Sequence, residues 1–375
     1  MNKKYRLLFA ILILFTISAV HAQKPFIHPG ILFNTADLNR IYSTGKHTDA
    51  PGYASFLLLK DNPLAQADYK MKGPFKVISR DGEFANTKSN MEADFSAAYL
   101  NCLMWAANHN KEHAERALLI LEAYADSLKL IPATNDAPLL VGLEGVKIVN
   151  ALEILKYSYK LAKPERLSKI TQMLKAVFLP VSETFYSAPA YTNGNWGPIV
   201  TKFYISAAIY LNDRKMYDKA INFYLHANDN GTIANYIDGK TGQIQESGRD
   251  QSHCQLGIGA MATVCEIAWK QGDDLYGGLD NRLLKGFEYV ASYNLGNVVP
   301  FRKWTDITGK YSDWEDISDK GRGRFIPIYQ MVYNHYKQRK GLTMPFVEQV
   351  INKMGAEGYD RDQPGFGALL YLGSK

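Results

Sequence analysis

Cysteine is scarce in this chain of 375 residues, which holds only Cys102, Cys254 and Cys265. Three irregularly spaced cysteines exclude a disulfide framework and a cysteine-based zinc site. We therefore expect all three to be buried as small apolar residues. Without disulfides a chain of this length must be stabilised by a large core, and 46% of its residues are hydrophobic.

Long apolar runs are also scarce, because only residues 7–17 form one. This run follows three basic residues and leads to small residues ending at Ala22, which predicts a secretory signal peptide over residues 1–22. It is shorter than the ~20 residues that span a bilayer. We expect an exported, periplasmic protein without a stable membrane anchor, whose mature chain, residues 23–375, forms one domain.

The chain lacks a strong excess of charge of either sign. Its formal net charge is +6, and about +3 remains once the three basic residues of the signal peptide are removed. This balance and the export signal argue against nucleic-acid binding.

Metal-ligand motifs are missing too, since His109 and His113 of "HNKEH" lie at a helix break and lack the residue order of a zincin. We expect neither a metal nor a cofactor.

Helical periodicity dominates what is present. Apolar residues recur at spacings of three and four in ten segments, separated by short breaks rich in Pro, Gly, Asn and Asp. The segments are 91–108, 113–128, 143–159, 166–186, 199–211, 214–228, 252–272, 280–295, 326–341 and 343–354. Ten helices joined by short connections predict an all-α fold of antiparallel hairpins. Closure into a single-domain α/α toroid, an incomplete barrel, buries both sides of each hairpin.

Three segments between the helices have an unusual composition: residues 191–198, 238–253 and 297–325. Each is rich in Asn, Gly, aromatic and charged residues, and each leads directly into an apolar helix. Loops on one rim of a rigid scaffold are where binding groups usually collect. These three segments are therefore the expected location of a binding site.

The stretch "ESGRDQSH" brings Glu246, Arg249, Asp250 and His253 into eight positions. If a helix begins near residues 247–250, these side chains lie on adjoining parts of one face. Asp250 can then orient the His253 ring, and Glu246 can pair with Arg249. The alternative is a capped helix start with a solvated ion pair and a structural histidine.

Two glycines, Gly257 and Gly259, follow inside the same predicted helix. Each costs roughly 1 kcal/mol relative to Ala in a helix interior. We expect a neighbouring helix or a ligand to approach closely there.

The stretch "NGNWGP" is the second candidate element. Asn193 and Asn195 offer neutral amide donors, Trp196 offers a flat apolar face, and Pro198 suits the first turn of a helix. Amides beside a stacking aromatic ring suit the binding of a sugar carboxylate. The alternative is a tight turn with one buried tryptophan.

Five segments together resemble the alginate-lyase-like group of bacterial polysaccharide lyases, and within it the members that act on alginate or glucuronan. In chain order they are "HPGILFNTADLNRI", "NGNWGP", "ESGRDQSH", "EIAWKQGDDLYGGLDNRLLKGFEYVASYNLGN" and "GRGRFIPIYQMVYNHYKQRKGL". The resemblance covers most of the mature chain. It implies an α/α toroid that cleaves uronate polymers by β-elimination, with an Asn, a His, an Arg and a Tyr around the sugar carboxylate.

One family feature is missing. The adjacent Asn-His pair of the better-known alginate lyases is absent, because Asn193 and Asn195 are followed by Gly194 and Trp196. We therefore assign the histidine role to His253.

The chemistry that the resemblance implies requires a neutralised carboxylate and two proton transfers. Removing H5 builds negative charge on the carboxylate, and each well-placed donor contributes ~3 to 4 kcal/mol. The candidate donors are Asn195, Arg302 and His253. A base must take H5 and an acid must protonate O4. In mannuronate and glucuronate both atoms lie on one side of the ring, so one tyrosine with a cation-lowered pKa can serve as both.

Tyr311 is the preferred tyrosine because it lies in a long polar loop nine residues after Arg302. Tyr293 is the second choice, and a core position in a helix is the stronger alternative for it. Glu246 is expected to hold Arg249 or His253 in place. Arg322 and Arg324 are expected to bind flanking carboxylates of the polymer. Three tryptophans are expected to stack on sugar rings: Trp196, Trp304 and Trp314. A solvated basic turn is the alternative for the two arginines. We expect an anionic polysaccharide as the partner, with polymannuronate as the preferred substrate.

Two other classes of function fit the same residues. A glycoside hydrolase on this toroid would use two carboxylates, Asp250 with Asp306 or Asp313, at ~6.5 to 9.5 Å if it inverts. The third hypothesis for the function is a non-catalytic periplasmic glycan-binding protein.

Overall fold

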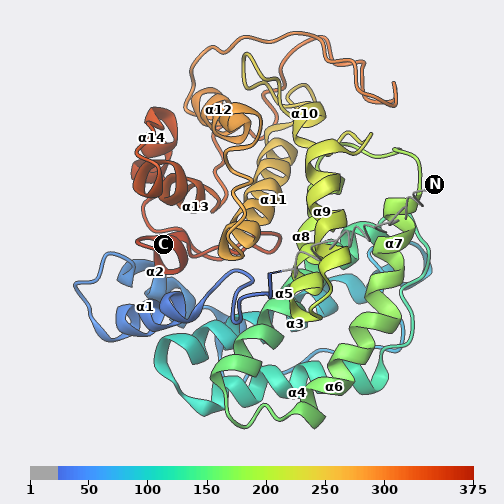
Figure 1. Cartoon of the computed structure of the whole chain (residues 1–375), viewed down its shortest axis with the longest axis vertical. Coiled ribbons are helices and arrows are strands. Elements are labelled where there is room, and N and C mark those ends of the chain that lie inside the picture. The colour runs from blue at the N-terminus through green and yellow to red at the C-terminus, as the bar shows by residue number, and fades with distance from the viewer. Residues whose placement is uncertain (1–23) are drawn as a thin grey trace, which may run out of the picture.

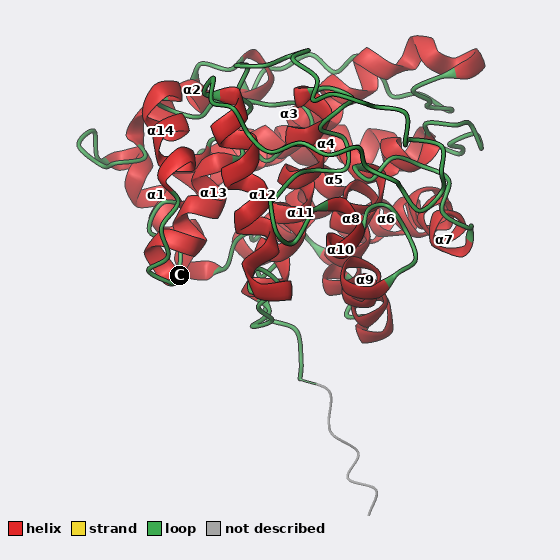
Figure 2. Ribbon diagram, turned by 90° about the horizontal axis from the view of Figure 1, so that it is seen from above, coloured by secondary structure: helices red, strands yellow, loops and turns green. Residues whose placement is uncertain are grey.

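The computed structural model describes residues 24–375, so the expected signal peptide over residues 1–22 lies outside the described chain. Within residues 24–375 all regular elements are helical, apart from three isolated β-bridges (Figure 2). The predicted all-α class is confirmed. In the same part of the chain, no helix combines the length and apolar character needed to cross a membrane.

The long helices form an inner and an outer row, which alternate along the chain (Figure 1). The inner row comprises α3 (Lys88–Asn108), α5 (Ala137–Ser158), α8 (Trp196–Tyr210) and α11 (Gln251–Lys270). The outer row comprises α4 (Lys111–Ser127), α6 (Pro164–Met173), α7 (Leu179–Ser187), α9 (Arg214–His226), α12 (Gly278–Asn294) and α14 (Pro345–Met354). Inner neighbours pack on one another, α3 on α5, α5 on α8 and α8 on α11, while α4, α9 and α12 pack on α3, α8 and α11. This is the hairpin arrangement that the sequence predicts.

The sequence explains which helices lie inside. Helix α5 reads "APLLVGLEGVKIVNALEILKYS", and nearly all of its residues are buried. Helix α6 instead buries only Leu167, Ile170 and Met173, one stripe at three-residue spacing. A helix that is apolar all round must be covered on every side, whereas an amphipathic helix can face water.

The two ends of the described chain pack together (Figure 1). Helices α1 (Thr35–Lys46) and α2 (Tyr53–Lys60) contact the C-terminal α15 (Gly367–Tyr371), and α1 also packs on α3. A buried ion pair between Asp37 and Lys270, 2.7 Å apart, joins α1 to α11. Ser374 donates a hydrogen bond of 2.6 Å to the same aspartate, so the C-terminal segment is anchored to the core.

All ten predicted helical segments are present, but two are interrupted. The segment 166–186 contains π-helical Leu174–Phe178 between α6 and α7, just before Pro180, which has no N–H to continue the regular pattern. The segment 326–341 divides into α13 (Tyr329–Tyr333) and π-helical Asn334–Arg339. The prediction missed α1, α2, α15 and the one-turn α10 (Ile233–Tyr236).

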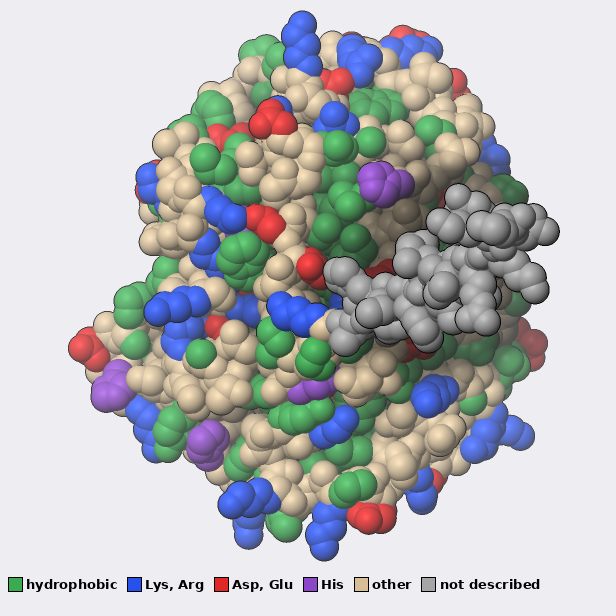
Figure 3. Space-filling view, viewed as in Figure 1, with side chains coloured by type: hydrophobic (Ala, Val, Ile, Leu, Met, Phe, Trp, Pro, Cys, Tyr) green, Lys and Arg blue, Asp and Glu red, His purple; other side chains and the backbone are tan. Residues whose placement is uncertain are grey.

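The three cysteines are free and buried, as predicted. The face of the molecule in Figure 3 carries Lys and Arg side chains dispersed among Asp and Glu side chains. This distribution agrees with the modest net charge of the chain.

Candidate active site

A cleft of about 450 Å³ opens at the rim where the inner helices α5, α8 and α11 begin. Its walls come from residues 135–136 before α5, residues 191–196 before α8, and the first turn of α11. Two long loops, residues 295–328 and 355–366, complete it. Helix N-termini present backbone N–H groups and a partial positive charge, so this rim favours an anionic ligand.

Asp250 caps α11 and fixes the His253 ring. Its carboxylate accepts hydrogen bonds from the His253 backbone N–H at 2.8 Å and from the ring Nδ1 at 2.7 Å. Burial opposes the charge on Asp250, but the hydrogen bonds from His253 and the nearby Arg249 guanidinium hold its pKa to about 2. The predicted helix start and the predicted Asp–His contact are both confirmed. With Nδ1 engaged, Nε2 is the ring nitrogen that remains for a ligand.

Glu246, just before α11, is fully buried and accepts hydrogen bonds from several side chains. It accepts hydrogen bonds from Arg249 Nη1 at 2.7 Å and from Tyr236 Oη at 2.9 Å. The side-chain amide of Asn195 donates to both of its oxygens, at 2.8 and 2.9 Å. The predicted Glu246–Arg249 pair is confirmed, and the carboxylate also ties the turn before α8 to the start of α11.

These contacts show which of the two candidate asparagines has a side chain free to bind a ligand. Both line the cleft, but the donor group of Asn195 is committed to Glu246. Asn193 is 8% exposed, and its Oδ1 finds no hydrogen-bond partner within residues 24–375. Asn193, rather than Asn195, therefore has its side-chain amide available to a ligand.

Tyr236, which the sequence analysis missed, explains the close approach expected at Gly257. A Cβ at Gly257 would lie 1.9 Å from the Tyr236 hydroxyl, and a Cβ at Gly194 would lie 2.2 Å from its ring. The ring thus lies between the α8 and α11 segments, and both glycines are needed for it to reach Glu246. Gly259 instead meets the side chains of Ile328 and Gln363.

Tyr311 reaches the cleft from the loop 295–328, and its hydroxyl donates to the Tyr191 carbonyl at 3.2 Å. Buried Asp306 shapes this part of the loop. It accepts from the Tyr311 backbone N–H at 2.9 Å, from Ser312 Oγ at 2.8 Å and from Asn230 Nδ2 at 2.8 Å. Burial opposes the Asp306 charge, but these donors, together with Thr308, hold its pKa well below its usual range.

The expected depression of the tyrosine pKa is wrong for Tyr311. Burial raises the pKa of its hydroxyl above the ordinary value, and the Arg249 guanidinium offsets this only in part. Asp306 and Glu246 add further negative charge nearby. Tyr311 is therefore a protonated phenol, which cannot act as a phenolate base and can act only as a proton donor.

Several predicted residues lie outside the cleft. Arg302 and Trp304 line a separate pocket of about 210 Å³, where Arg302 pairs with Asp238 at 2.5 Å. Tyr293 is buried in α12, and Arg322 stacks over its ring at 4.0 Å. The structure therefore does not bring these four residues to His253 and Tyr311.

Arg324 and Trp314 are not cleft residues either. Arg324 is exposed, and its carbonyl accepts a hydrogen bond from Gln255. Trp314 packs against Gly248, where a Cβ would lie 2.2 Å from the tryptophan Cβ. Both residues belong to the loop 295–328, which packs across the start of α11 and presents only part of its length to the cleft.

Two cleft arginines were missed. Arg80 and Arg361 line the cleft, and both pair with the buried carboxylate of Glu92. Their segments, "SRDGE" and "GYDRDQPGFG", have the Gly and Asp content that singled out the other loops. Applying that criterion to the whole chain would have identified them.

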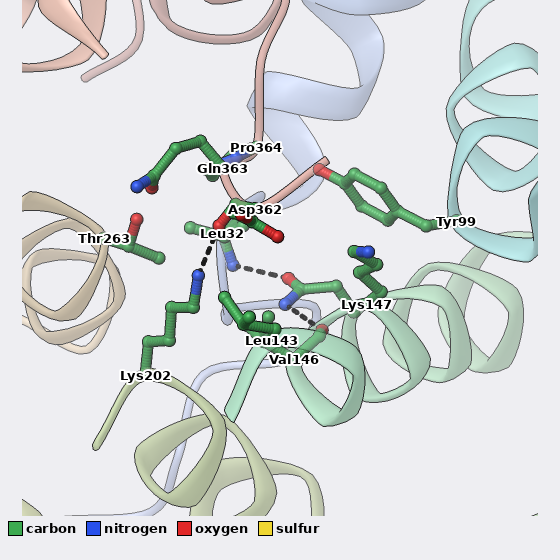
Figure 4. A pocket seen from close by; sticks show the side chains of 11 residues that line it. Leu32, Tyr99, Leu143, Val146, Lys147, Lys202, Thr263, Asp362, Gln363 and Pro364 are labelled. Carbon is green, nitrogen blue, oxygen red and sulfur yellow. Dashed lines mark hydrogen bonds between the residues drawn. The ribbon is translucent and has the colours of Figure 1, made fainter. Parts of the chain in front are cut away.

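A small pocket of about 20 Å³ lies under the cleft and shares Leu143 and Asp362 with it (Figure 4). Lys202 of α8 donates a hydrogen bond of 2.6 Å to the Asp362 carbonyl. Burial lowers the pKa of Lys202 to about 8, although Asp362 acts in the opposite direction. This contact ties the loop 355–366 to an inner helix and so fixes the edge of the cleft that carries Arg361.

The structure offers no metal site in the part of the chain that it describes, because no three His, Cys, Asp or Glu side chains are grouped to hold an ion. The histidines of "HNKEH" have other partners. His113 Nδ1 lies 2.8 Å from Asn101 Oδ1, and the His109 ring stacks on Tyr42 with centroids 4.0 Å apart.

Comparisons with known proteins agree on the family and the fold. A family model described as alginate lyase matches residues 51–301. No curated protein sequence matches the chain. Among solved structures, alginate lyase A1-III from Sphingomonas species A1 has a TM-score of 0.64 and 12% identity, over 90% of this chain and 94% of that one. A tyrosine-to-phenylalanine variant of A1-III, complexed with a tetrasaccharide, has a TM-score of 0.68 and 14% identity, over 93% and 97%. With the family model covering more than half of its residues, the chain belongs to the alginate lyase family and has the predicted α/α-toroid fold.

Proposed function

We propose that this chain is a polysaccharide lyase that cleaves a 1,4-linked uronate polymer by β-elimination and leaves a 4,5-unsaturated uronate. Polymannuronate is the first choice of substrate and glucuronan the second. The observation that carries the proposal is the convergence of His253, Tyr311, Arg249 and Asn193 in one cleft. Family membership and the tetrasaccharide complex of a fold relative support it.

In this proposal Arg249 and Asn193 bind the carboxylate of the unit that loses H5. Arg249 is held by buried Glu246, so its guanidinium is already placed before substrate arrives. Asn193 lines the same cleft, where its side-chain Nδ2 can donate to the carboxylate. Donors that are fixed in advance stabilise the enolate-like charge that develops on the carboxylate when H5 leaves.

The two proton transfers are divided between His253 and Tyr311. His253 Nε2 takes H5, while Asp250 on Nδ1 stabilises the resulting imidazolium. The electron pair of the C5–H5 bond forms the C4–C5 double bond, and the C4–O4 bond breaks. Tyr311, kept protonated by burial, gives its proton to O4. For mannuronate or glucuronate both groups must act from one side of the ring.

Arg80 and Arg361 bind carboxylates of neighbouring units, a role that the sequence analysis gave to Arg322 and Arg324. They share Glu92 on the cleft wall, which limits their movement. Trp196 also lines the cleft and offers its face to a sugar ring.

The hydrolase alternative has little support in the geometry. Asp250 is occupied by His253, and Asp306 is buried under several donors and does not line the cleft. Asp313 is exposed and does not line the cleft either. None of the three carboxylates is placed to protonate a glycosidic oxygen. The lyase is therefore the function that we propose.

We also propose export to the periplasm, as the signal-peptide pattern of residues 1–22 predicts. N-terminal sequencing of the protein from a cell fraction tests this. A mature N-terminus at Gln23 in the periplasm supports export, and an intact N-terminus in the cytoplasm contradicts it.

The enzymatic test uses the mature protein with polymannuronate, polyguluronate, glucuronan and a neutral glucan. The proposal predicts new ultraviolet absorbance from the unsaturated uronate on polymannuronate or glucuronan and none on the glucan. New reducing ends without this absorbance would identify a hydrolase. Binding without any cleavage would identify a glycan-binding protein.

A further inference from the structure

A second groove, of about 410 Å³, adjoins the cleft between the start of α5 and helix α7. It includes apolar side chains such as Pro138, Pro180 and Phe185. Asn135 and Tyr191 line both the groove and the cleft, so the two spaces are adjacent. A polymer bound in the cleft can therefore extend into the groove, whose volume is in the range of ligand pockets.

Aromatic rings follow the same route. The Phe185 and Tyr191 ring centroids are 6.0 Å apart, and those of Tyr191 and Trp196 are 6.3 Å apart. Phe185 is buried in a small core cluster, whereas the partly exposed Tyr191 lines both the groove and the cleft, so Tyr191 is the ring of this series that the two spaces share. Apolar and aromatic side chains make up most of the surface on which small ligands bind, with few polar groups to orient them.

The groove and the cleft differ sharply in charge. The cleft is lined by Arg80, Arg249 and Arg361, whereas no Lys, Arg, His, Asp or Glu of the described chain lines the groove. An ionised carboxylate that is buried without a partner loses its hydration and gains nothing in return. A sugar in the groove must therefore turn any carboxylate toward solvent.

We propose that the groove is a subsite that binds a neighbouring unit of the polymer by its apolar ring face, without contacting a carboxylate. This proposal rests on the proposed lyase function and deepens it. The cleft requires a uronate, whereas the groove accepts an uncharged sugar unit equally well. The substrates then include polymers in which neutral sugars are interspersed among the uronates.

The test compares polymannuronate with polymannuronate in which a fraction of the carboxyl groups has been reduced to neutral mannose. The proposal predicts unsaturated products with mannose at one fixed position relative to the cleaved bond, and no cleavage in which mannose replaces the unit that loses H5. Products that contain only uronates around every cleaved bond would overturn it. No absorbance with unmodified polymannuronate or glucuronan would instead overturn the lyase function itself.

A charge placed in the groove provides a second test. Ala188 is exposed and lines the groove, so Ala188→Asp is compatible with folding, and Ala188→Ser is its uncharged control. A carboxylate placed in the groove loses hydration when a sugar ring packs over it, whether or not that sugar is charged. We expect Ala188→Asp to lower kcat/KM about fivefold on polymannuronate and on the reduced polymer alike, and Ala188→Ser to change neither. Equal rates for all three proteins on both polymers would show that the groove holds no substrate.

Discussion

The cleft, with Arg249 and Tyr311, and the region outside it, with Arg302 and Tyr293, carry the same kinds of residue but hold them differently. Arg249 is 29% exposed and pairs with the fully buried carboxylate of Glu246. Arg302 is 65% exposed and pairs with Asp238 at the surface. Tyr311 lies in the cleft, and buried Asp306 fixes its backbone by accepting a hydrogen bond from its N–H. Tyr293 is instead buried in the core, where Arg322 stacks over its ring.

The difference shows that residue type and loop composition do not distinguish a site from a surface. A buried carboxylate with several donors fixes the groups around it, which is what a preorganised site needs. An exposed ion pair contributes little and leaves its partners mobile. The following substitutions test that contrast, one pair of matched positions at a time.

The largest effect is expected from removing the guanidinium of Arg249. Arg249→Ala should lower kcat/KM by about 10²- to 10³-fold, the usual effect of losing one donor to a developing negative charge. Arg302→Ala should stay within about twofold, because its ion pair is exposed. Initial rates of ultraviolet absorbance on polymannuronate measure both. A larger loss in Arg302→Ala would reverse the assignment.

Glu246→Gln tests the buried carboxylate that holds Arg249 and Asn195. The substitution replaces a charged acceptor by an amide, so donors from three residues lose part of their partner. We expect kcat to fall about 10- to 100-fold and the free energy of unfolding to fall by about 1–3 kcal/mol. Glu315→Gln is the control, because Glu315 is 70% exposed and pairs with Lys303 at the surface. Equal behaviour of the two variants would show that Glu246 has no positioning role.

Asp306→Asn tests the turn that presents Tyr311. Since the carboxylate accepts both a backbone and several side-chain hydrogen bonds, its loss should loosen residues 306–312. We expect kcat to fall about tenfold, as a misplaced catalytic group predicts, and the loop to be cleaved faster by a protease. Asp313→Asn, at an exposed position of the same loop, should change neither. Unaltered kcat in Asp306→Asn would contradict the positioning role.

The smallest effect concerns pH and the Asp250–His253 contact. Because the pKa of Asp250 is held to about 2, below its ordinary 3.8, the contribution of its charge to stability is complete above pH ~4. It is lost as the pH falls from there toward 2. Denaturant unfolding of wild type and Asp250→Asn should therefore show a constant difference between pH 5 and 7, and a smaller one below pH 4. A difference that grew on acidification would contradict this assignment.

Much of the fold could be predicted from the sequence, because the helices carry strong apolar periodicity. The ten segments, the start of α11 and the Asp250–His253 contact all depend on residues close in sequence. Helices α1 and α2 were missed because contacts with α15, more than 300 residues away, cover them.

The site could be predicted only in part, because its walls come from distant loops. The local stretch "ESGRDQSH" gave Glu246, Arg249 and His253 correctly as neighbours. Sequence alone could not tell which part of the loop 295–328 faces inward, since that depends on the Asn230–Asp306 hydrogen bond across 76 positions. It also could not show that Asn195 is engaged by Glu246 while Asn193 is free.

The most direct test of the central claim is the initial rate of unsaturated-uronate formation by Tyr311→Phe, compared with wild type and Tyr293→Phe on polymannuronate. If Tyr311 protonates O4, its variant should lose about 10²- to 10⁴-fold in kcat, while Tyr293→Phe retains most of the wild-type rate. A Tyr311→Phe enzyme with the full wild-type rate would show that the cleft described above does not carry out the elimination through this tyrosine.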